Sequence, residues 1–165
     1  MTATALTTLT CPSCNTTNRI PTERLGDRPR CGKCKAPLFQ GHPLELDSSN
    51  VDVVIGNTGI PVLVDCWAPW CGPCRSFAPT FEAAAAKHTD VVFAKVNTEV
   101  EQQLAGELNI RSIPTLMVFR EQVLLFNQAG ALSAGQLETL LQQVAELDMA
   151  QIHAEIAARE ADNQG

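Results

Sequence analysis

Two cysteines separated by two residues, Cys71 and Cys74, have the clearest capacity for chemistry in this chain. They stand in the sequence Trp-Cys-Gly-Pro-Cys at positions 70–74, between an apolar segment and a segment of helical pattern. At the start of a helix this spacing brings both sulfurs together across one turn, where they can form and break a disulfide. The helix dipole favours a thiolate there, so we expect Cys71 to have a lowered pKa and to be the nucleophile, with Cys74 as the resolving thiol.

Four further cysteines form two more CxxC pairs near the N-terminus. Sixteen residues separate Cys11 and Cys14 from Cys31 and Cys34, a spacing that predicts a zinc site. Four thiolates complete a tetrahedral shell, so the single Zn²⁺ is expected to be structural and not catalytic. Two structural disulfides are the alternative, and loss of the zinc on oxidation is a possible extension of its role.

Charge is distributed unevenly along the chain. The first 40 residues have a net charge of +4, whereas the whole chain has a net charge of −6. A basic zinc module could bind nucleic acid, but the acidic remainder and the lack of aromatic residues in positions 1–36 argue against it. We therefore expect contacts with proteins and none with nucleic acid.

Cysteine usage also bears on the compartment. Seven cysteines and no recognisable export or membrane segment favour a reducing, cytoplasmic location, without a membrane association. The seventh, Cys66, is interpreted as a buried core residue, with a secondary redox thiol as the alternative. The three histidines are scattered, and we assign them no chemistry.

These side chains must be positioned by alternating strands and helices. Residues 61–67 are apolar on both faces, which predicts a buried central strand ending at the CxxC motif. A helix is expected from Cys71 to about Lys87 with Pro79 inside it. The other expected strands are 44–46, 91–96, 116–120 and 123–127, and the other expected helices are 49–55, 99–107 and 134 to about 159.

The pattern predicts an α/β protein with three parts. A four-cysteine zinc module occupies residues 1–40, the redox domain residues 41–146, and a C-terminal helical extension with a frayed tip residues 147–165. The extension has Leu147, Ile152 and Ile156 at helical spacing. It is expected to be a solvated helix, with a docking face for a partner or a second copy as the alternative.

Two longer motifs identify a family. Positions 64–74 read VDCWAPWCGPC and positions 111–115 read RSIPT, which together resemble the thioredoxin family over about residues 44–145. With CxxC pairs before that region, the chain resembles the zinc-containing bacterial class called thioredoxin 2. The resemblance implies a thioredoxin fold, a central mixed sheet flanked by helices, preceded by a zinc-ribbon-like module. It also implies a general protein-disulfide reductase that is recharged by an NADPH-dependent thioredoxin reductase and has no tightly bound organic cofactor.

The resemblance also assigns roles to residues. Cys71, Cys74 and Asp65 are the implied catalytic groups, with Asp65 as the buried acid beneath the cysteines. Burial should raise the pKa of Asp65, so that it can exchange a proton with Cys74. Trp67 and Lys95 are implied supporting residues. The implied substrate surface consists of Trp70, Gly72, Pro73, Ile113, Pro114 and Gly130, with Pro114 in the cis form.

Two alternatives to a reductase remain at this point. An oxidase or isomerase would use the same two cysteines, but the Gly-Pro spacer resembles the reducing members of the family. A scaffold protein would use the same apolar surface for binding, with its redox activity incidental. Substituting Cys71 or Cys74 distinguishes a redox enzyme from a scaffold, since only a scaffold would keep its function after the change.

Overall fold

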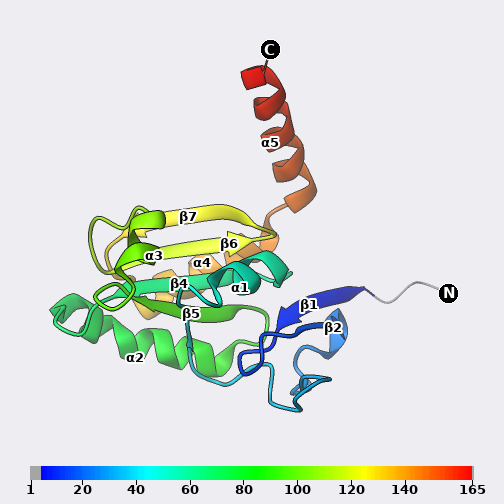
Figure 1. Cartoon of the computed structure of the whole chain (residues 1–165), viewed down its shortest axis with the longest axis horizontal. Helices are drawn as coiled ribbons and strands as arrows, with labels where there is room; N and C mark the ends of the chain where they lie inside the picture. Colours follow the sequence, from blue (N-terminus) through cyan, green and yellow to red (C-terminus); the bar gives the residue numbers. More distant parts are fainter. Residues whose placement is uncertain (1–4, 165) are drawn as a thin grey trace.

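A five-stranded mixed sheet organises the chain in the computed structural model, which describes residues 5–164. Its order is β3-β5-β4-β6-β7, with β3, β5 and β4 parallel and with β6 and β7 antiparallel to their neighbours (Figure 1). The strands are β3 (Leu44–Glu45), β4 (Val62–Trp67), β5 (Val92–Asn97), β6 (Thr115–Arg120) and β7 (Val123–Ala129). The expected central strand is confirmed as β4, which lies in the middle of the sheet because both of its faces are apolar.

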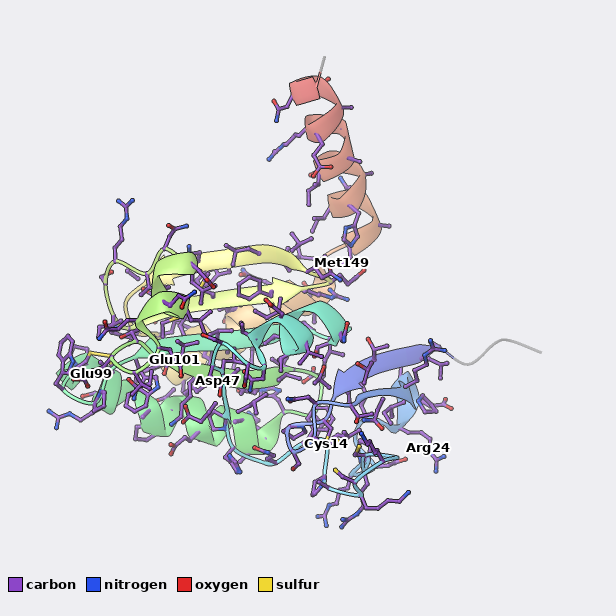
Figure 2. All side chains as sticks on the ribbon, in the orientation of Figure 1. Cys14, Arg24, Asp47, Glu99, Glu101 and Met149 are labelled. Atoms are coloured by element: carbon purple, nitrogen blue, oxygen red, sulfur yellow. A yellow bond between two sulfur atoms is a disulfide. The ribbon has the colours of Figure 1, made fainter. Side chains whose placement is uncertain are left out.

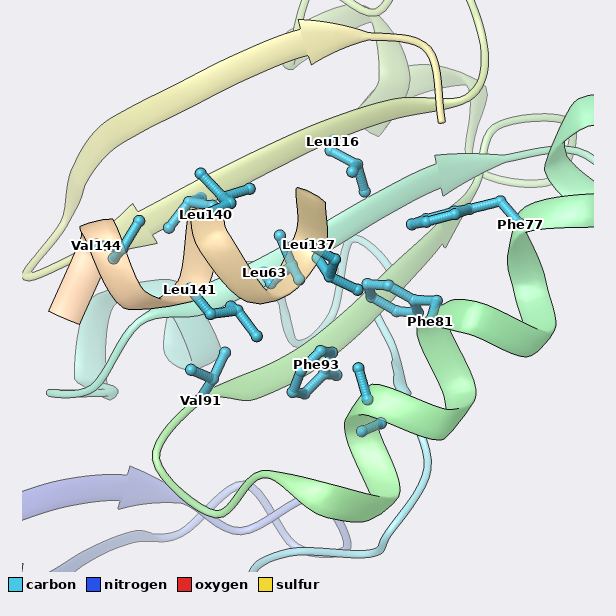
Figure 3. Close-up of a cluster of buried hydrophobic side chains, with 13 residues drawn as sticks. Leu63, Phe77, Phe81, Val91, Phe93, Leu116, Leu137, Leu140, Leu141 and Val144 are labelled. Carbon is cyan, nitrogen blue, oxygen red and sulfur yellow. The ribbon is translucent and has the colours of Figure 1, made fainter. Parts of the chain in front are cut away.

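The helices that cover the two faces of this sheet are α1 (Val51–Asn57), α2 (Gly72–Lys87), α3 (Gln102–Glu107) and α4 (Ala134–Glu146). The last helix, α5 (Met149–Gln164), projects away from the sheet (Figure 1). On one face α2 and α4 pack on the sheet, and Figure 3 shows Phe81, Phe93 and Leu137 meeting there. Phe81 and Phe93 make an edge-to-face contact with ring centroids 5.3 Å apart. On the other face Val54 of α1 and Leu104 of α3 pack against the sheet.

Alternation along β4 determines where its two polar side chains point. Leu63 packs under α2 and α4, and Asp65, two residues later, lines a cavity beneath α2. Cys66, the next residue along the strand, points to the opposite face and packs there with Val64 and Val96. Cys66 is fully buried, which confirms its interpretation as a core residue and separates it from the CxxC motif.

The N-terminal module is a small hairpin packed on the main domain. Its strands β1 (Leu6–Thr10) and β2 (Thr17–Pro21) are antiparallel. Leu9 packs in a cluster with Ile60, while Gly59 N donates to Thr8 O at 2.8 Å. A Cβ on Gly59 would lie 3.0 Å from Thr8 Oγ1, which is tighter than an ordinary van der Waals contact, so a side chain at this position would have to displace Thr8.

The final helix expected over residues 134–159 is instead two helices. Leu147 is extended (φ −66°, ψ 138°), and the Asp148 carboxylate accepts from Gln151 N at 3.1 Å. A carboxylate in this position caps a new helix, and α5 therefore starts in a new direction and projects from the body, with Met149 at the junction (Figures 1 and 2). Within the described residues α5 continues to Gln164 through a segment rich in alanine, so the helix ends later than expected, and the frayed tip stays a prediction. Gly165 lies outside those residues.

Two other helices start later than expected, for one shared reason. Asp47 Oδ1 accepts from Ser49 N at 2.8 Å, and Asn97 Oδ1 accepts from Glu99 N at 3.1 Å. These side-chain hydrogen bonds hold a turn before each helix, so α1 begins at Val51 and α3 at Gln102.

No helix among residues 5–164 is long and apolar enough to span a membrane.

Candidate functional site

The CxxC motif begins α2, as its spacing predicts. Strand β4 ends at Trp67, a short turn follows, and Cys71 occupies the N-cap position of the helix. Pro73 lies in the first turn, where its missing N–H costs no hydrogen bond. Cys71 and Cys74 form a disulfide, and both are buried. The structure therefore presents the oxidised form of a dithiol that caps a helix.

The helix N-terminus also determines which sulfur can hold a negative charge. Cys74 N donates to Cys71 Sγ at 3.2 Å, so an unpaired amide of the first turn points at this sulfur. When the disulfide is reduced, the same amide stabilises a thiolate on Cys71, as does the helix dipole. This geometry agrees with the expected nucleophile.

Asp65 lies in a small cavity behind the disulfide. The cavity has a volume of about 60 Å³, and its lining includes Cys74, Trp67 and Lys95 as well as Asp65. Asp65 is 3% exposed, and its Oδ1 has no hydrogen-bond partner among residues 5–164. Burial raises the pKa of Asp65 to about 7, although the charge of Lys95 opposes the shift. A carboxyl group with this pKa can take and release a proton near neutral pH.

The loop before β6 closes over the two cysteines. The Ile113–Pro114 peptide bond is cis, which confirms the predicted isomer. Cys71 Sγ lies 3.9 Å from Ile113 O, and Gly130 N donates to Pro114 O at 2.8 Å. Gly130 has φ +104°, a conformation that favours glycine. These expected substrate residues thus come together from segments far apart in sequence.

The two tryptophans have different surroundings. Trp70 is 67% exposed and lines a groove of about 390 Å³ together with Ile113 and Arg111. Trp67 is partly buried and packs beside the cysteines, with Lys95 Nζ 4.9 Å from its ring centroid. The side of the groove opposite Trp70 is formed by α3, and the sequence did not predict it. Its position depends on how α3 packs on the sheet, for which the sequence has no local motif.

The four N-terminal cysteines also converge. Their sulfurs lie within 4.8 Å of one another, with Cys11 Sγ 3.6 Å from Cys34 Sγ and Cys14 Sγ 3.7 Å from Cys31 Sγ. All four are free, so the structure does not contain the alternative pair of disulfides. The donor set is therefore four thiol groups around one point.

The surroundings of these sulfurs suit a bound cation. The amides of Ser13 and Lys33 donate to Cys11 Sγ and Cys31 Sγ, each at 3.4 Å. The amide of Cys34, with further hydrogen bonds, lowers the pKa of Cys31 to about 6, whereas burial raises the pKa of Cys11 to about 11. A divalent ion would favour the thiolate form of every member. The residues present therefore fit a tetrahedral thiolate site of the kind that binds zinc.

The fold and the helix-capping disulfide beside a cis-proline define a thiol–disulfide oxidoreductase. Comparison with known families gives the same class: residues 42–143 match the thioredoxin family model, and residues 10–36 match the model for the N-terminal part of thioredoxin 2, a zinc ribbon. The chain belongs to the thioredoxin family.

Relatives and solved structures support this assignment. Thioredoxin C-3 of Corynebacterium nephridii is 41% identical over 82% of this chain and 93% of its own length. A putative thioredoxin 2 of Streptomyces coelicolor is 43% identical over 72% of this chain and 87% of its own. A mutant thioredoxin of Halobacterium salinarum superposes with a TM-score of 0.60 at 29% identity, covering 66% of this chain and 95% of that one. The chain is thus a disulfide reductase with an N-terminal metal site.

Proposed function

We propose that this protein reduces disulfides of substrate proteins, with Cys71 as the attacking thiol and Cys74 as the resolving thiol. The observation that supports this most directly is the position of Cys71 at the N-cap of α2, where Cys74 N donates to its sulfur. In the first step the Cys71 thiolate attacks one sulfur of the substrate disulfide. That bond breaks, a mixed disulfide forms, and the other substrate sulfur leaves as a thiolate that takes a proton from water.

The second step frees the substrate and oxidises the protein. Cys74 gives its proton to the Asp65 carboxylate, and the resulting thiolate attacks Cys71 Sγ. The bond between Cys71 and the substrate breaks, and the second substrate sulfur leaves as a thiolate and is protonated. The substrate has gained two electrons, and the protein retains the Cys71–Cys74 disulfide. The pKa of Asp65 near 7 suits both directions of this proton transfer.

The substrate chain is proposed to bind across the disulfide in an extended form. The edge of the cis-proline loop at Ile113 and Pro114 offers backbone groups for strand-like pairing. Trp70, which is 67% exposed, supplies apolar contact area beside them. The proposed contact surface is completed by Gly72, Pro73 and Gly130, while Trp67 and Lys95 support the dithiol from behind.

The metal of the N-terminal module is proposed to be one Zn²⁺ held by Cys11, Cys14, Cys31 and Cys34. Sulfur ligands within 4.8 Å of one another match the thiolate preference of zinc. With four protein ligands, the ion would stabilise the module and leave no position for a substrate. Oxidation of the thiolates would release the ion, which would make the module redox-sensitive.

The remaining assignments concern partners and organisation. We assign residues 1–40 to the zinc module, 41–146 to the thioredoxin domain and 147–165 to the extension. Members of the family are reduced by thioredoxin reductase, and we assign an NADPH-dependent reductase to this chain. Seven cysteines, five of them free in the structure, favour the reducing environment of the cytoplasm.

The test is reduction of insulin disulfides by dithiothreitol with the purified full-length protein, followed by turbidity. The wild type should accelerate the reaction and Cys71→Ser should abolish the acceleration. Cys66→Ser is the matched control, because this thiol is buried on the far face of the sheet. Metal analysis of the same preparation should give one zinc per chain. A wild type that binds zinc but fails to reduce insulin would indicate a scaffold instead.

A further inference from the structure

Three charged side chains lie side by side across three neighbouring strands. The strand register places Glu45 of β3 opposite Lys95 of β5, and Lys95 opposite Asp65 of β4. Residues in register on adjacent strands point to the same face of a sheet. Asp65 faces the cavity beneath α2, so the sheet presents a row of acid, base and acid on the side of the CxxC motif.

The ammonium group of Lys95 is not shared equally between the two acids. Lys95 Nζ lies 3.4 Å from Glu45 Oε1 and 4.9 Å from the centroid of the Trp67 ring. Asp65 belongs to none of the ion pairs formed by residues 5–164, and its Oδ1 has no hydrogen-bond partner there. Lys95 thus pairs with the outer acid and stacks on an aromatic ring, while the inner acid is left without a partner.

We propose that Glu45 is a positioning residue of the disulfide exchange, which holds the Lys95 ammonium over Trp67 and so leaves the Asp65 carboxyl unpaired and able to accept the Cys74 proton. The proposal rests on the role of Asp65 given under the proposed function. The proton moves from Cys74 Sγ to the Asp65 carboxylate, and the Cys74 thiolate then attacks Cys71 Sγ as described above. Glu45 itself touches neither the substrate nor the sulfurs.

Other charged groups around Asp65 do not replace Lys95 in this arrangement. Arg75 and Glu82 of α2 line the same cavity, but neither forms an ion pair with Asp65 in the described part of the chain. From β6 the residue opposite Asp65 is Leu116, which has no charge, and the neighbouring Cys66 packs on the other face of the sheet. Lys95 is accordingly the cation whose charge lowers the pKa of Asp65.

Loss of the Glu45 charge acts on Asp65 in one direction through two routes. Lys95 is released from its partner and can approach the unpaired carboxyl, and a negative charge is removed from the row. Both changes favour the ionised form of Asp65. Because an opposite charge within about 4–6 Å lowers a carboxyl pKa by about 1–3 units, a full approach of Lys95 would produce a shift of about one unit or more.

The experiment uses the full-length protein with Glu45→Gln. The pKa of Asp65 is measured by carboxyl NMR in the oxidised form, and the midpoint of the pH dependence of insulin reduction is measured in parallel. Both midpoints should fall by roughly one pH unit. Glu107→Gln is the matched control, since it removes the same charge from an exposed position on α3, across the sheet, and it should leave both midpoints unchanged. Midpoints for Glu45→Gln equal to those of the wild type would overturn the proposal.

A second comparison separates positioning from a direct field effect. In a Lys95→Met background, Glu45→Gln should shift the Asp65 midpoint by less than half of its shift in the wild type, and an undiminished shift would overturn the proposal.

The variant Asp65→Asn distinguishes the proposed role of Glu45 from the proton transfer by Asp65 on which it rests. If Asp65→Asn keeps the wild-type pH profile, the proton-transfer role itself fails. If it removes the pH dependence while Glu45→Gln shifts nothing, only the role of Glu45 fails.

Discussion

Replacing the buried acid Asp65 by asparagine should stabilise the oxidised protein by an amount that grows with pH. The pKa of Asp65 is about 7 in the fold, against an ordinary value of 3.8. The folded state therefore binds the proton more tightly than the unfolded state does, and stability is lost as the pH rises from about 4 to 7. Asparagine has nearly the same shape but no charge, so the variant escapes this loss.

The magnitude follows from the difference between the two pKa values. At about 1.4 kcal/mol per pKa unit, the 3% exposed carboxyl destabilises the fold by about 2 kcal/mol at pH 5 and by about 4 kcal/mol at pH 8. Above about pH 8 both states are ionised, so the difference between variant and wild type should become constant. Below about pH 3 both states are protonated, and the difference should approach zero.

The assay is guanidinium unfolding of oxidised wild type and Asp65→Asn at several pH values between 5 and 8.5. Because both proteins contain the same zinc module, its own pH dependence cancels in the difference. An exposed control, Glu107→Gln, should differ from the wild type by less than about 0.5 kcal/mol. A difference between Asp65→Asn and wild type that does not change with pH would refute the reasoning, as would a variant that is less stable at pH 8.

Three further predictions concern parts of the chain outside the redox site. The variant Cys34→Ser should no longer bind zinc, and amide exchange in β1 and β2 should become faster, while insulin reduction stays within about twofold of wild type. Retention of a full equivalent of zinc would contradict the four-thiolate site. Gly59→Val should clash with Thr8 and destabilise the protein by about 1–3 kcal/mol, with faster proteolysis of residues 37–43; unchanged proteolysis would argue against this contact. Cys66→Val should retain insulin reduction, since a buried thiol in an apolar cluster serves as core, and a large loss of activity would instead indicate a redox role.

Local sequence patterns predicted the parts of the molecule that depend on local geometry. The CxxC spacing placed Cys71 at the start of α2, because helix capping and the proline in the first turn act within a few residues. The apolar run of β4 predicted a central strand, and its alternation explains why Asp65 and Cys66 face opposite sides. The four N-terminal cysteines converge as their spacing predicted.

Features that depend on packing between distant segments were not predicted. The ion pair between Glu45 and Lys95 requires the register of β3 on β5, which no local pattern in a two-residue strand determines. The groove beside Trp70 requires the placement of α3. The division between α4 and α5 does have a local signal at Asp148, but the apolar positions continue at helical spacing across it and conceal the cap.

The central claim is that Cys71 attacks the substrate disulfide and that Cys74 resolves the mixed disulfide. The most direct test is to incubate reduced Cys74→Ser with insulin and to map the covalent products by mass spectrometry. The account predicts a stable adduct in which Cys71 is linked to an insulin cysteine, and no adduct for the variant with both Cys71→Ser and Cys74→Ser. An adduct through Cys66 or a zinc-module cysteine, or no adduct at all, would contradict it.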